Sequence, residues 1–356
     1  MARVLFLFPA GKNLPTGGLK VVYDYAGQLI KDGHQVIIAY AAYFSSTDQS
    51  VRRKLKAVAK YVYLRVMRQG GYTWYSKNPE IREVFVWKLN YSSLPKADVY
   101  VATAVCTAPY VNLFPVSGEK KFYFIQGYES FIVPNDKFIR WTYRLPLKKI
   151  VISRWLSKLV AEEGSESIIV PNGFDSSVYK LTIPIEEKDK FLVSMLYHVN
   201  VKKDTNVGMA AVKLAKKRIP ELRLVMFGAY PKPENLPDWV EYHRSPSRKT
   251  HLEINNRASI YVGCSRIEGW GLTIGEAMMC GQAVACTDND GYKEMATDNA
   301  NALVTPVGDV DALAASIVRL VSDDQLRHRL ASKGMDTIKA FDFNESYKKF
   351  RNAIIM

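Results

Sequence analysis

The chain lacks the features that would place it in several large classes of protein. Its 356 residues include only four cysteines (Cys106, Cys264, Cys280 and Cys286) and no Cys-x-x-Cys pair. Scattered cysteines argue against a disulfide framework or a zinc site and are typical of reduced core residues in a cytoplasmic protein. No run of 18 apolar residues occurs, so no membrane-spanning helix is expected. No Gly-x-Gly-x-x-Gly follows the first apolar run, which argues against a dinucleotide fingerprint.

Acidic residues are missing only locally. Residues 49–79 contain no Asp or Glu, and the whole chain has a net charge of +14. The first 170 residues hold 24 Lys and Arg against 12 Asp and Glu, so most of the excess positive charge lies in the front half. This asymmetry indicates an anionic partner for that half, which could be a membrane surface, an acidic acceptor or a nucleic acid.

Within the acid-free stretch, residues 51–69 have the periodicity of an amphipathic helix, with basic residues between the apolar ones. Two interpretations follow. Residues 51–68 could lie on an anionic membrane surface, or the helix could simply pack on a sheet with a solvated charged face. The apolar stripe consists of Val51, Leu55, Val58, Val62 and Val66.

Apolar runs and helical periodicity alternate along most of the chain. The start, MARVLFLFPAG, superficially resembles a signal peptide, but Pro9 stops its apolar run, which favours a buried first strand. The chain is longer than one core usually supports. We therefore predict an α/β fold of two Rossmann-like, doubly wound parallel sheets facing a cleft.

The most informative stretch is residues 261–286. It reads as a strand ending near Ser265, then Glu268, a Gly-Trp-Gly turn, and a helix from about Thr273 to a Cys280-Gly281 end. A helix N-terminus behind a glycine loop binds anions, because its first N–H groups have no intrahelical partner. With carboxylates at Glu268 and in the first helical turn at Glu276, the pattern favours a ligand that carries phosphates and hydroxyls. Alternatively, Thr273 and Glu276 have the spacing of a capping box.

Glu268-x7-Glu276, with Gly-Trp-Gly-Leu after the first Glu and Glu-Ala-Met-x-Cys-Gly from the second, resembles the donor site of family-4-like retaining glycosyltransferases of the GT-B fold. The resemblance implies transfer of a hexosyl or deoxyhexosyl group from a nucleotide sugar to a glycan or lipid-linked saccharide in cell-surface polysaccharide synthesis. It also implies an acceptor domain at 1–175, a linker at 176–190 and a donor domain at 191–343. The helix at 344–356 is expected to pack back on the first domain.

The resemblance also implies roles for particular residues. Glu268 and Lys203 are the expected catalytic pair, with Glu268 on the sugar hydroxyls and Lys203 on the diphosphate. Glu276 is expected at the nucleotide ribose, and His198 stands where the family usually has Arg. Gln126 and Glu129 are expected to position the acceptor. The donor-binding set is completed by Gly17, Gly18, Gly269, Trp270, Gly271, Leu272, Thr273 and Glu294.

No cofactor or metal is expected, because Asp288 and Asp290 lie in a turn before Gly291. Two alternatives stay open: a nucleotide-sugar epimerase of the same architecture, and a basic nucleic-acid-binding protein without turnover. Nucleic-acid binding is not the expectation, although aromatic residues interleave with the basic stretch at positions 61–75. We expect a cytoplasmic protein, peripheral on the inner face of the membrane if the basic segment contacts lipid.

Overall fold

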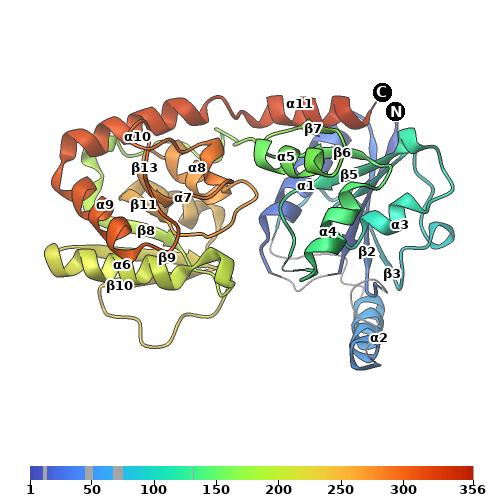
Figure 1. The fold of residues 1–356 in the computed structure, drawn as a ribbon, viewed down its shortest axis with the longest axis horizontal. Coiled ribbons are helices and arrows are strands. Elements are labelled where there is room, and N and C mark those ends of the chain that lie inside the picture. Colours follow the sequence, from blue (N-terminus) through green and yellow to red (C-terminus); the bar gives the residue numbers. More distant parts are fainter. Residues whose placement is uncertain (11–13, 45–50, 67–74, 131, 356) are drawn as a thin grey trace. The chain divides into compact units, whose positions relative to one another are not determined.

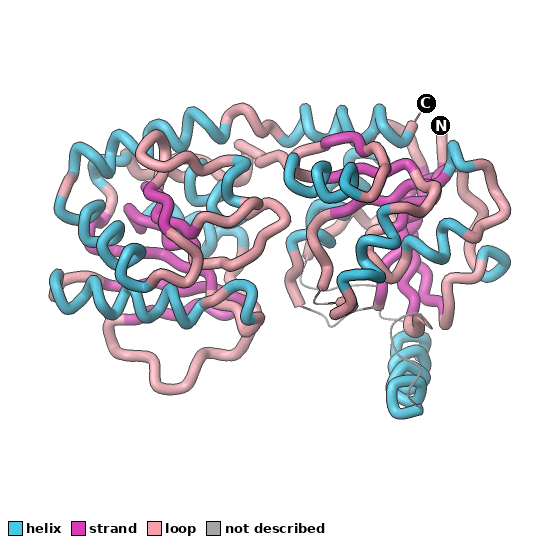
Figure 2. Tube along the Cα trace, in the orientation of Figure 1, coloured by secondary structure: helices cyan, strands magenta, loops and turns pink. Residues whose placement is uncertain are grey.

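The structure is a computed structural model that describes residues 1–10, 14–44, 51–66, 75–130 and 132–355 (Figure 1). The chain divides into two compact units. Unit 1 comprises Met1–Pro171 and Tyr347–Met356, and unit 2 comprises Asn172–Ser346. Figure 2 shows that each unit is built from a sheet with helices packed along it.

Unit 1 contains a seven-stranded sheet in the order β3-β2-β1-β4-β5-β6-β7, and its paired strands all run parallel. Parallel strands are buried on both faces, which explains why β1 and β5 are continuous apolar runs. The strand order reverses between β1 and β4, and ligands of such sheets bind beyond the carboxyl ends of the strands at this position. The strands are β1 Arg3–Pro9, β2 Gln35–Ala41, β3 Arg82–Val86, β4 Val99–Ala102, β5 Lys121–Ile125, β6 Lys148–Val151 and β7 Ser167–Ile169.

The helices of unit 1 include two that the sequence analysis did not predict, α3 and α4. The second of these begins at an ordinary cap, because the Asn135 side chain accepts a hydrogen bond from the N–H of Phe138 at 3.1 Å. The helices are α1 Gly17–Lys31, α2 Val51–Val66, α3 Ala108–Asn112, α4 Asp136–Tyr143 and α5 Arg154–Glu162. Short 3-10 turns occur at η1 Tyr91–Ser93 and η2 Gly118–Lys120.

The last helix, α11 (Phe343–Ile354), begins in unit 2, and its residues from Tyr347 onward belong to unit 1. The Phe350 ring is fully buried and stacks on Tyr25 at 4.7 Å between ring centroids. Arg351 binds the Asp32 carboxylate at 2.9 Å, just beyond the end of α1. The end of the chain therefore completes the core of the unit that its beginning forms.

Helix α2 lies beyond the ends of β2 and β3 and clear of the other helices of its unit (Figure 1). Its apolar stripe is exposed, with Leu55 at 65%, Val58 at 45% and Val62 at 51% of their full accessible area. Ala57 is buried, and Tyr61 packs edge-on against Trp87. The interpretation of an ordinary helix that packs its stripe on the sheet is therefore wrong for these side chains. The end predicted at residues 67–69 lies outside the described residues.

Unit 2 repeats the architecture with six parallel strands in the order β10-β9-β8-β11-β12-β13. Its strand order reverses between β8 and β11, so its own ligand position lies beyond the carboxyl ends of these two strands. The strands are β8 Asp189–Leu196, β9 Arg223–Gly228, β10 Val240–Arg244, β11 Ala258–Gly263, β12 Ala283–Thr287 and β13 Leu303–Thr305. The helices are α6 Thr205–Arg218, α7 Arg248–Arg257, α8 Leu272–Met279, α9 Val310–Ser322 and α10 Asp324–Ile338, with short turns η3 Ile185–Glu187, η4 Val201–Lys203 and η5 Tyr292–Glu294.

These two parallel sheets confirm the predicted fold class. Among the described residues, none of the helices combines the length and the hydropathy that crossing a bilayer requires.

Candidate functional site

Polar residues gather in unit 2 where β8 and β11 end side by side. The two strands pair in parallel, with Tyr261 opposite Ser194 and Val262 opposite Met195. The loop after β8 contains His198 and Lys203, and the loop after β11 contains Glu268. Both loops leave the carboxyl edge of the sheet at the point where the strand order reverses, which is the expected ligand position.

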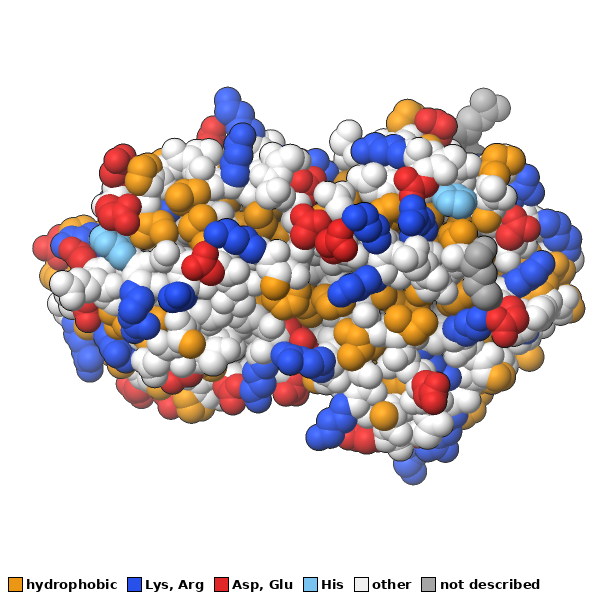
Figure 3. Space-filling view, turned by 90° about the horizontal axis from the view of Figure 1, so that it is seen from above, with side chains coloured by type: hydrophobic (Ala, Val, Ile, Leu, Met, Phe, Trp, Pro, Cys, Tyr) orange, Lys and Arg blue, Asp and Glu red, His pale blue; other side chains and the backbone are white. Residues whose placement is uncertain are grey.

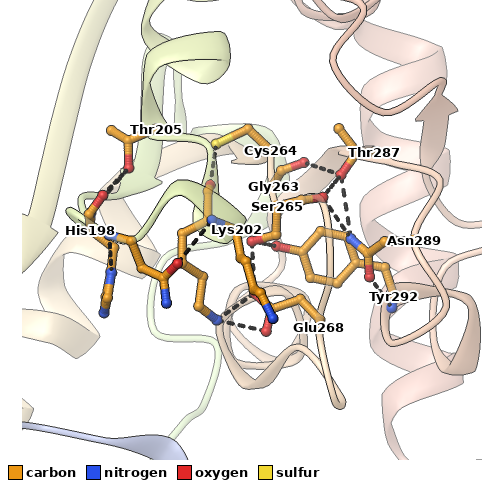
Figure 4. Close-up of polar contacts among 12 residues, drawn as sticks. His198, Lys202, Thr205, Gly263, Cys264, Ser265, Glu268, Thr287, Asn289 and Tyr292 are labelled. Atoms are coloured by element: carbon orange, nitrogen blue, oxygen red, sulfur yellow. Dashed lines mark hydrogen bonds and ion pairs between the residues drawn. The ribbon is translucent and has the colours of Figure 1, made fainter. Parts of the chain in front are cut away.

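The centre of this site is an ion pair between Lys203 and Glu268. The Lys203 Nζ lies 2.6 Å from both carboxylate oxygens of Glu268, and the Ser265 hydroxyl donates to Oε1 at 2.7 Å. The Glu268 side chain is only 10% exposed, whereas Lys203 is 28% exposed. The structure thus brings together the two residues that the sequence predicted as the catalytic pair, and it adds Ser265 to them (Figure 4).

The two loops are also joined through their main chains. The N–H of Arg266 donates to the carbonyl of Lys202 at 2.7 Å, and the Cys264 thiol donates to the carbonyl of Lys203 at 3.3 Å. The Arg266 guanidinium pairs with Asp204 at 2.6 Å. These contacts fix the position of Lys203 relative to the β11 loop. Sequence reasoning missed all three contacts, and the two that end on main-chain carbonyls leave no residue signature.

Ser265 is itself held from three directions. Tyr292 donates to its hydroxyl at 3.2 Å, and its carbonyl accepts from Thr287 at 2.5 Å and from Asn289 at 3.0 Å. Figure 4 shows Thr287, Asn289 and Tyr292 converging on Ser265 from the side opposite His198. Glu268 is therefore oriented by a serine that the loop after β12 positions. The signal for Ser265 in the sequence was its place at a strand end.

The helix behind Glu268, α8, begins one residue earlier than predicted. Its N-cap is Gly271, with φ of +105° and no side-chain cap. A Cβ at this position would lie 2.6 Å from the Tyr292 ring, so both the conformation and the space require glycine. The capping box of Thr273 and Glu276 is therefore wrong. The first N–H groups of α8 are left without intrahelical acceptors, as an anion site requires.

Glu276 and Trp270 are both buried in unit 2. Glu276 is the fifth residue of α8, so its predicted place in the first turn is wrong by one residue. Burial, followed by the charge of Glu276, raises the pKa of Tyr179, which contacts that carboxylate. The Trp270 ring packs edge-on against Phe341 at 5.1 Å. The Trp270 ring therefore packs in the interior of unit 2.

His198 is held as a neutral side chain. Its Nδ1 accepts the N–H of Asn200 at 2.9 Å, which leaves Nε2 to carry the proton. Burial and the nearby charge of Lys203 lower its pKa to about 4, partly offset by Glu268. Thr205, the first residue of α6, accepts the N–H of His198 at 3.0 Å. His198 therefore offers a hydrogen bond at a position where the resemblance leads us to expect the positive charge of an Arg.

The remaining predicted residues fall in two places. Glu294 ends the short turn η5 in unit 2. Gly17 and Gly18 begin α1 in unit 1, where the Gln126 amide donates to the carbonyl of Gly18 at 3.0 Å. Glu129 accepts the N–H of Val105 at 2.5 Å in the same unit. Within the described part of the chain, no cluster of three or more His, Cys, Asp or Glu residues could hold a metal ion.

The comparisons with known proteins agree with this architecture. Sucrose-phosphate synthase from Thermosynechococcus elongatus superposes with a TM-score of 0.73 and 15% identity over 99% of this chain and 98% of that one. Anabaena HepE, solved in complex with UDP-glucose, superposes with a TM-score of 0.72 and 16% sequence identity over 99% of each chain. The chain therefore has the two-domain GT-B fold.

A family model matches unit 2. Residues 180–337 are similar to the model of "Glycosyl transferases group 1". The phosphatidyl-myo-inositol mannosyltransferase of Mycolicibacterium smegmatis is 22% identical over 193 residues, which are 51% of this chain and 50% of that protein. The alignments span about half the length of the first curated relatives.

Proposed function

We propose that the protein is a retaining glycosyltransferase that moves a sugar from a nucleotide-sugar donor to a saccharide or lipid-linked acceptor. The observation that carries the proposal is the Lys203–Glu268 pair at the point where the strand order of unit 2 reverses. The family match at residues 180–337 supports it, as does the UDP-glucose bound in the HepE structure. Relatives named for phosphatidyl-myo-inositol and O-antigen mannosyl transfer support a role in glycolipid or polysaccharide synthesis.

The chemistry asks the site to stabilise negative charge on the departing phosphate. Lys203 and the N–H groups at the start of α8 are the donors for that charge, and pre-organised donors act strongly in a site closed to water. Lys203 is now neutralised by Glu268. When the diphosphate binds, Lys203 donates some of its hydrogen bonds to the phosphate in place of Glu268. The Glu268 carboxylate then becomes available to the sugar hydroxyls.

The reaction breaks the bond between the anomeric carbon and the phosphate oxygen and forms a bond from that carbon to the acceptor oxygen. The acceptor proton passes to the departing phosphate. Both oxygens of Glu268 accept hydrogen bonds from Lys203, and one also accepts from Ser265. A carboxylate that is held by these donors, and then by the sugar hydroxyls that it is proposed to contact, is a poor nucleophile. This favours transfer on one face, with retention, over a glycosyl-enzyme intermediate. No metal is assigned a role.

The same proposal places unit 1 at an anionic membrane through α2. Its exposed stripe of Leu55, Val58 and Val62 is flanked by exposed Lys54 and Lys56, so apolar and basic groups share one accessible helix. A bilayer with anionic headgroups matches both kinds of group. The protein would then act as a peripheral enzyme on the cytoplasmic face, where lipid-linked acceptors are held.

The structure adds no observation in favour of the two alternatives to the basic, aromatic-containing stretch noted in the sequence. Nucleic-acid binding generally uses a stripe of one charge. On the face of the molecule seen in Figure 3, Lys and Arg side chains are interspersed with Asp and Glu. The epimerase alternative makes a different prediction, because an epimerase converts one nucleotide sugar into its epimer and needs no saccharide acceptor.

A thermal-shift panel of nucleoside diphosphates and nucleotide sugars tests the proposal. A ligand at 100 times its dissociation constant stabilises the native state by about 2.7 kcal/mol. We expect at least one nucleoside diphosphate and its sugar to raise the melting temperature of the full chain. If none does, while an oligonucleotide does with a steep salt dependence, the protein is a nucleic-acid-binding protein.

A further inference from the structure

The turn that carries Glu268 packs against two consecutive residues of the segment after β12, Gly291 and Tyr292. A Cβ on Gly291 would lie 2.6 Å from the Cβ of Glu268, so the main chain of this segment contacts the base of the Glu268 side chain directly. The next residue, Tyr292, is 2% exposed. A buried tyrosine at this position can influence the site in two ways, through its hydroxyl and through its ring.

The hydroxyl of Tyr292 reaches Glu268 through Ser265. It donates to the Ser265 hydroxyl at 3.2 Å, and that hydroxyl donates to Oε1 of Glu268 at 2.7 Å (Figure 4). Burial, followed by the charge of Glu268, raises the pKa of Tyr292 well above its usual range, so the phenol keeps its proton. Because a serine hydroxyl has one proton and Tyr292 occupies one of its lone pairs, the bond toward Glu268 has a fixed direction.

The two oxygens of the Glu268 carboxylate are held differently as a result. Oε1 accepts from both Lys203 and Ser265, and Oε2 accepts from Lys203. When Lys203 donates to a bound diphosphate, Ser265 still holds Oε1. The carboxylate then keeps its orientation and presents Oε2 to a sugar hydroxyl.

The ring of Tyr292 contacts the start of α8. A Cβ on Gly271, the N-cap of this helix, would lie 2.6 Å from Cδ1 of the ring. A Cβ on Gly263, at the end of β11, would lie 3.0 Å from Cε2. The ring therefore fills the space between the end of the strand and the start of the helix. Because protein interiors are close-packed, removing the ring would let Gly271 and the N–H groups after it shift.

We propose that Tyr292 is a positioning residue of the donor site, with its hydroxyl holding Glu268 through Ser265 and its ring holding the start of α8. Tyr292 acts through these groups and contacts neither the phosphates nor the sugar. The inference rests on the proposed function, because that function assigns the sugar to Glu268 and the diphosphate to α8. One side chain is then expected to affect the two parts of the donor separately.

Calorimetry on the full chain separates the two effects. The probes are UDP, UDP-glucose, GDP and GDP-mannose, and the affinity of each nucleotide sugar relative to its diphosphate reports the sugar contact. Tyr292→Phe removes only the hydroxyl and is expected to lower this ratio by about threefold, the scale of one neutral hydrogen bond, with diphosphate affinity unchanged. Tyr292→Leu also removes the ring and is expected to weaken the plain diphosphate by about tenfold, since displaced N–H groups bond a charged group less well.

A double-mutant cycle tests whether Tyr292 acts through Ser265. Ser265→Ala is expected to lower the sugar-to-diphosphate ratio by about tenfold, the scale of a hydrogen bond to a charged group. Adding Tyr292→Phe to Ser265→Ala is expected to change the ratio no further, because residues of one hydrogen-bond network are not additive. Tyr347→Phe, which removes a hydroxyl that donates to Asp32 at 2.6 Å in unit 1, is the matched control and is expected to leave the ratio unchanged.

Three results would overturn the positioning role. An unchanged ratio in Tyr292→Phe would exclude the hydroxyl, and additive effects of Tyr292→Phe and Ser265→Ala would exclude the path through Ser265. If Tyr292→Phe lowers the melting temperature and weakens diphosphates and nucleotide sugars in proportion, Tyr292 only supports packing. Failure of the proposed function gives a different result, because the wild type itself would then bind none of the four probes, and the positioning role would fall with it.

Discussion

The two units hold polar residues at the same topological position but with different electrostatic character. Beyond β8 and β11, unit 2 places two ion pairs, Lys203 with Glu268 and Arg266 with Asp204. Near β1 and β4, unit 1 places an amide, Gln126, and a carboxyl, Glu129, whose pKa burial raises to about 8. The same sheet topology therefore carries ion pairs in one unit, and in the other an amide and a carboxyl whose pKa is raised by burial.

The largest effect is expected from Glu268→Ala. Its carboxylate is the group proposed to meet the sugar during transfer, and loss of one such contact typically lowers turnover by about 10²–10³. Plain nucleoside diphosphate binding is expected to stay unchanged or tighten, because Lys203 loses its internal partner. Steady-state transfer and calorimetry on the same sample measure the two quantities.

Glu276→Ala tests whether the two glutamates of unit 2 have different roles, one toward the sugar and one toward the nucleotide. Because Glu276 is proposed to meet the ribose, this change is expected to weaken the nucleotide itself, by about 1–3 kcal/mol for a buried hydrogen-bonding group. Calorimetry measures it, and circular dichroism controls for folding. Equal effects of both glutamate changes, accompanied by unfolding, would mean that these residues only support the start of α8.

The pH dependence of the free energy of unfolding tests whether Glu129 of unit 1 is protonated in the folded protein. The pKa of Glu129 rises from 4.5 to about 8 on folding, so the folded protein keeps a proton that the unfolded chain releases between these values. The resulting stability is fully present below about pH 4.5 and is lost as the pH rises through about 8.

Relative to Glu129→Gln, which cannot ionise, the wild type is expected to lose up to about 1.4 kcal/mol per pH unit across this window. Urea unfolding of both proteins at several pH values measures the difference. A constant difference would show that Glu129 is already ionised in the folded protein.

Membrane binding through α2 is expected to be weaker and sensitive to salt. Changing the exposed Lys54 and Lys56 to Glu should reduce co-sedimentation with anionic liposomes, because each basic residue contributes about 1 kcal/mol near such a surface. Lys213→Glu with Lys217→Glu, on α6 of unit 2, is the matched control. If the wild type stays in the supernatant at low salt, α2 does not bind this membrane.

The smallest effect is expected from chelation. No residue in the site is assigned to a metal, so EDTA should leave transfer unchanged. A strict requirement for added Mg²⁺ or Mn²⁺ would show that the phosphates are neutralised by a metal as well as by Lys203.

The sequence predicted the sheets well, because buried parallel strands such as Val4–Leu7 are continuous apolar runs. Helix α4 was missed because its eight residues hold only about two turns of periodicity. The amphipathic pattern located α2 but could not say whether its stripe is buried, since a packed helix and an exposed one share that pattern. Only the structure shows Leu55 and Val62 exposed.

The two units also differ in how far their polar residues could be predicted from the sequence. Glu268 could be found because it lies in a dense motif, and Lys203 because it follows the first strand of unit 2; the structure joins them. The Arg266 main-chain bond to Lys202 has no residue signature, and Ser153 after β6 looks like any helix-capping serine. Among the described residues of unit 1, its buried hydroxyl has no partner, a result of packing that a sequence does not record.

The central claim is that Lys203 and the start of α8 bind a nucleoside diphosphate in unit 2. Calorimetric titration of UDP, GDP and ADP into the wild type, Lys203→Ala and the surface control Lys339→Ala tests it most directly. We expect one diphosphate to bind the wild type and the control equally, and Lys203→Ala to lose roughly 1.5–3 kcal/mol, the scale of a charge-assisted hydrogen bond. Equal affinity of Lys203→Ala and wild type, or no binding of any diphosphate, would contradict the account.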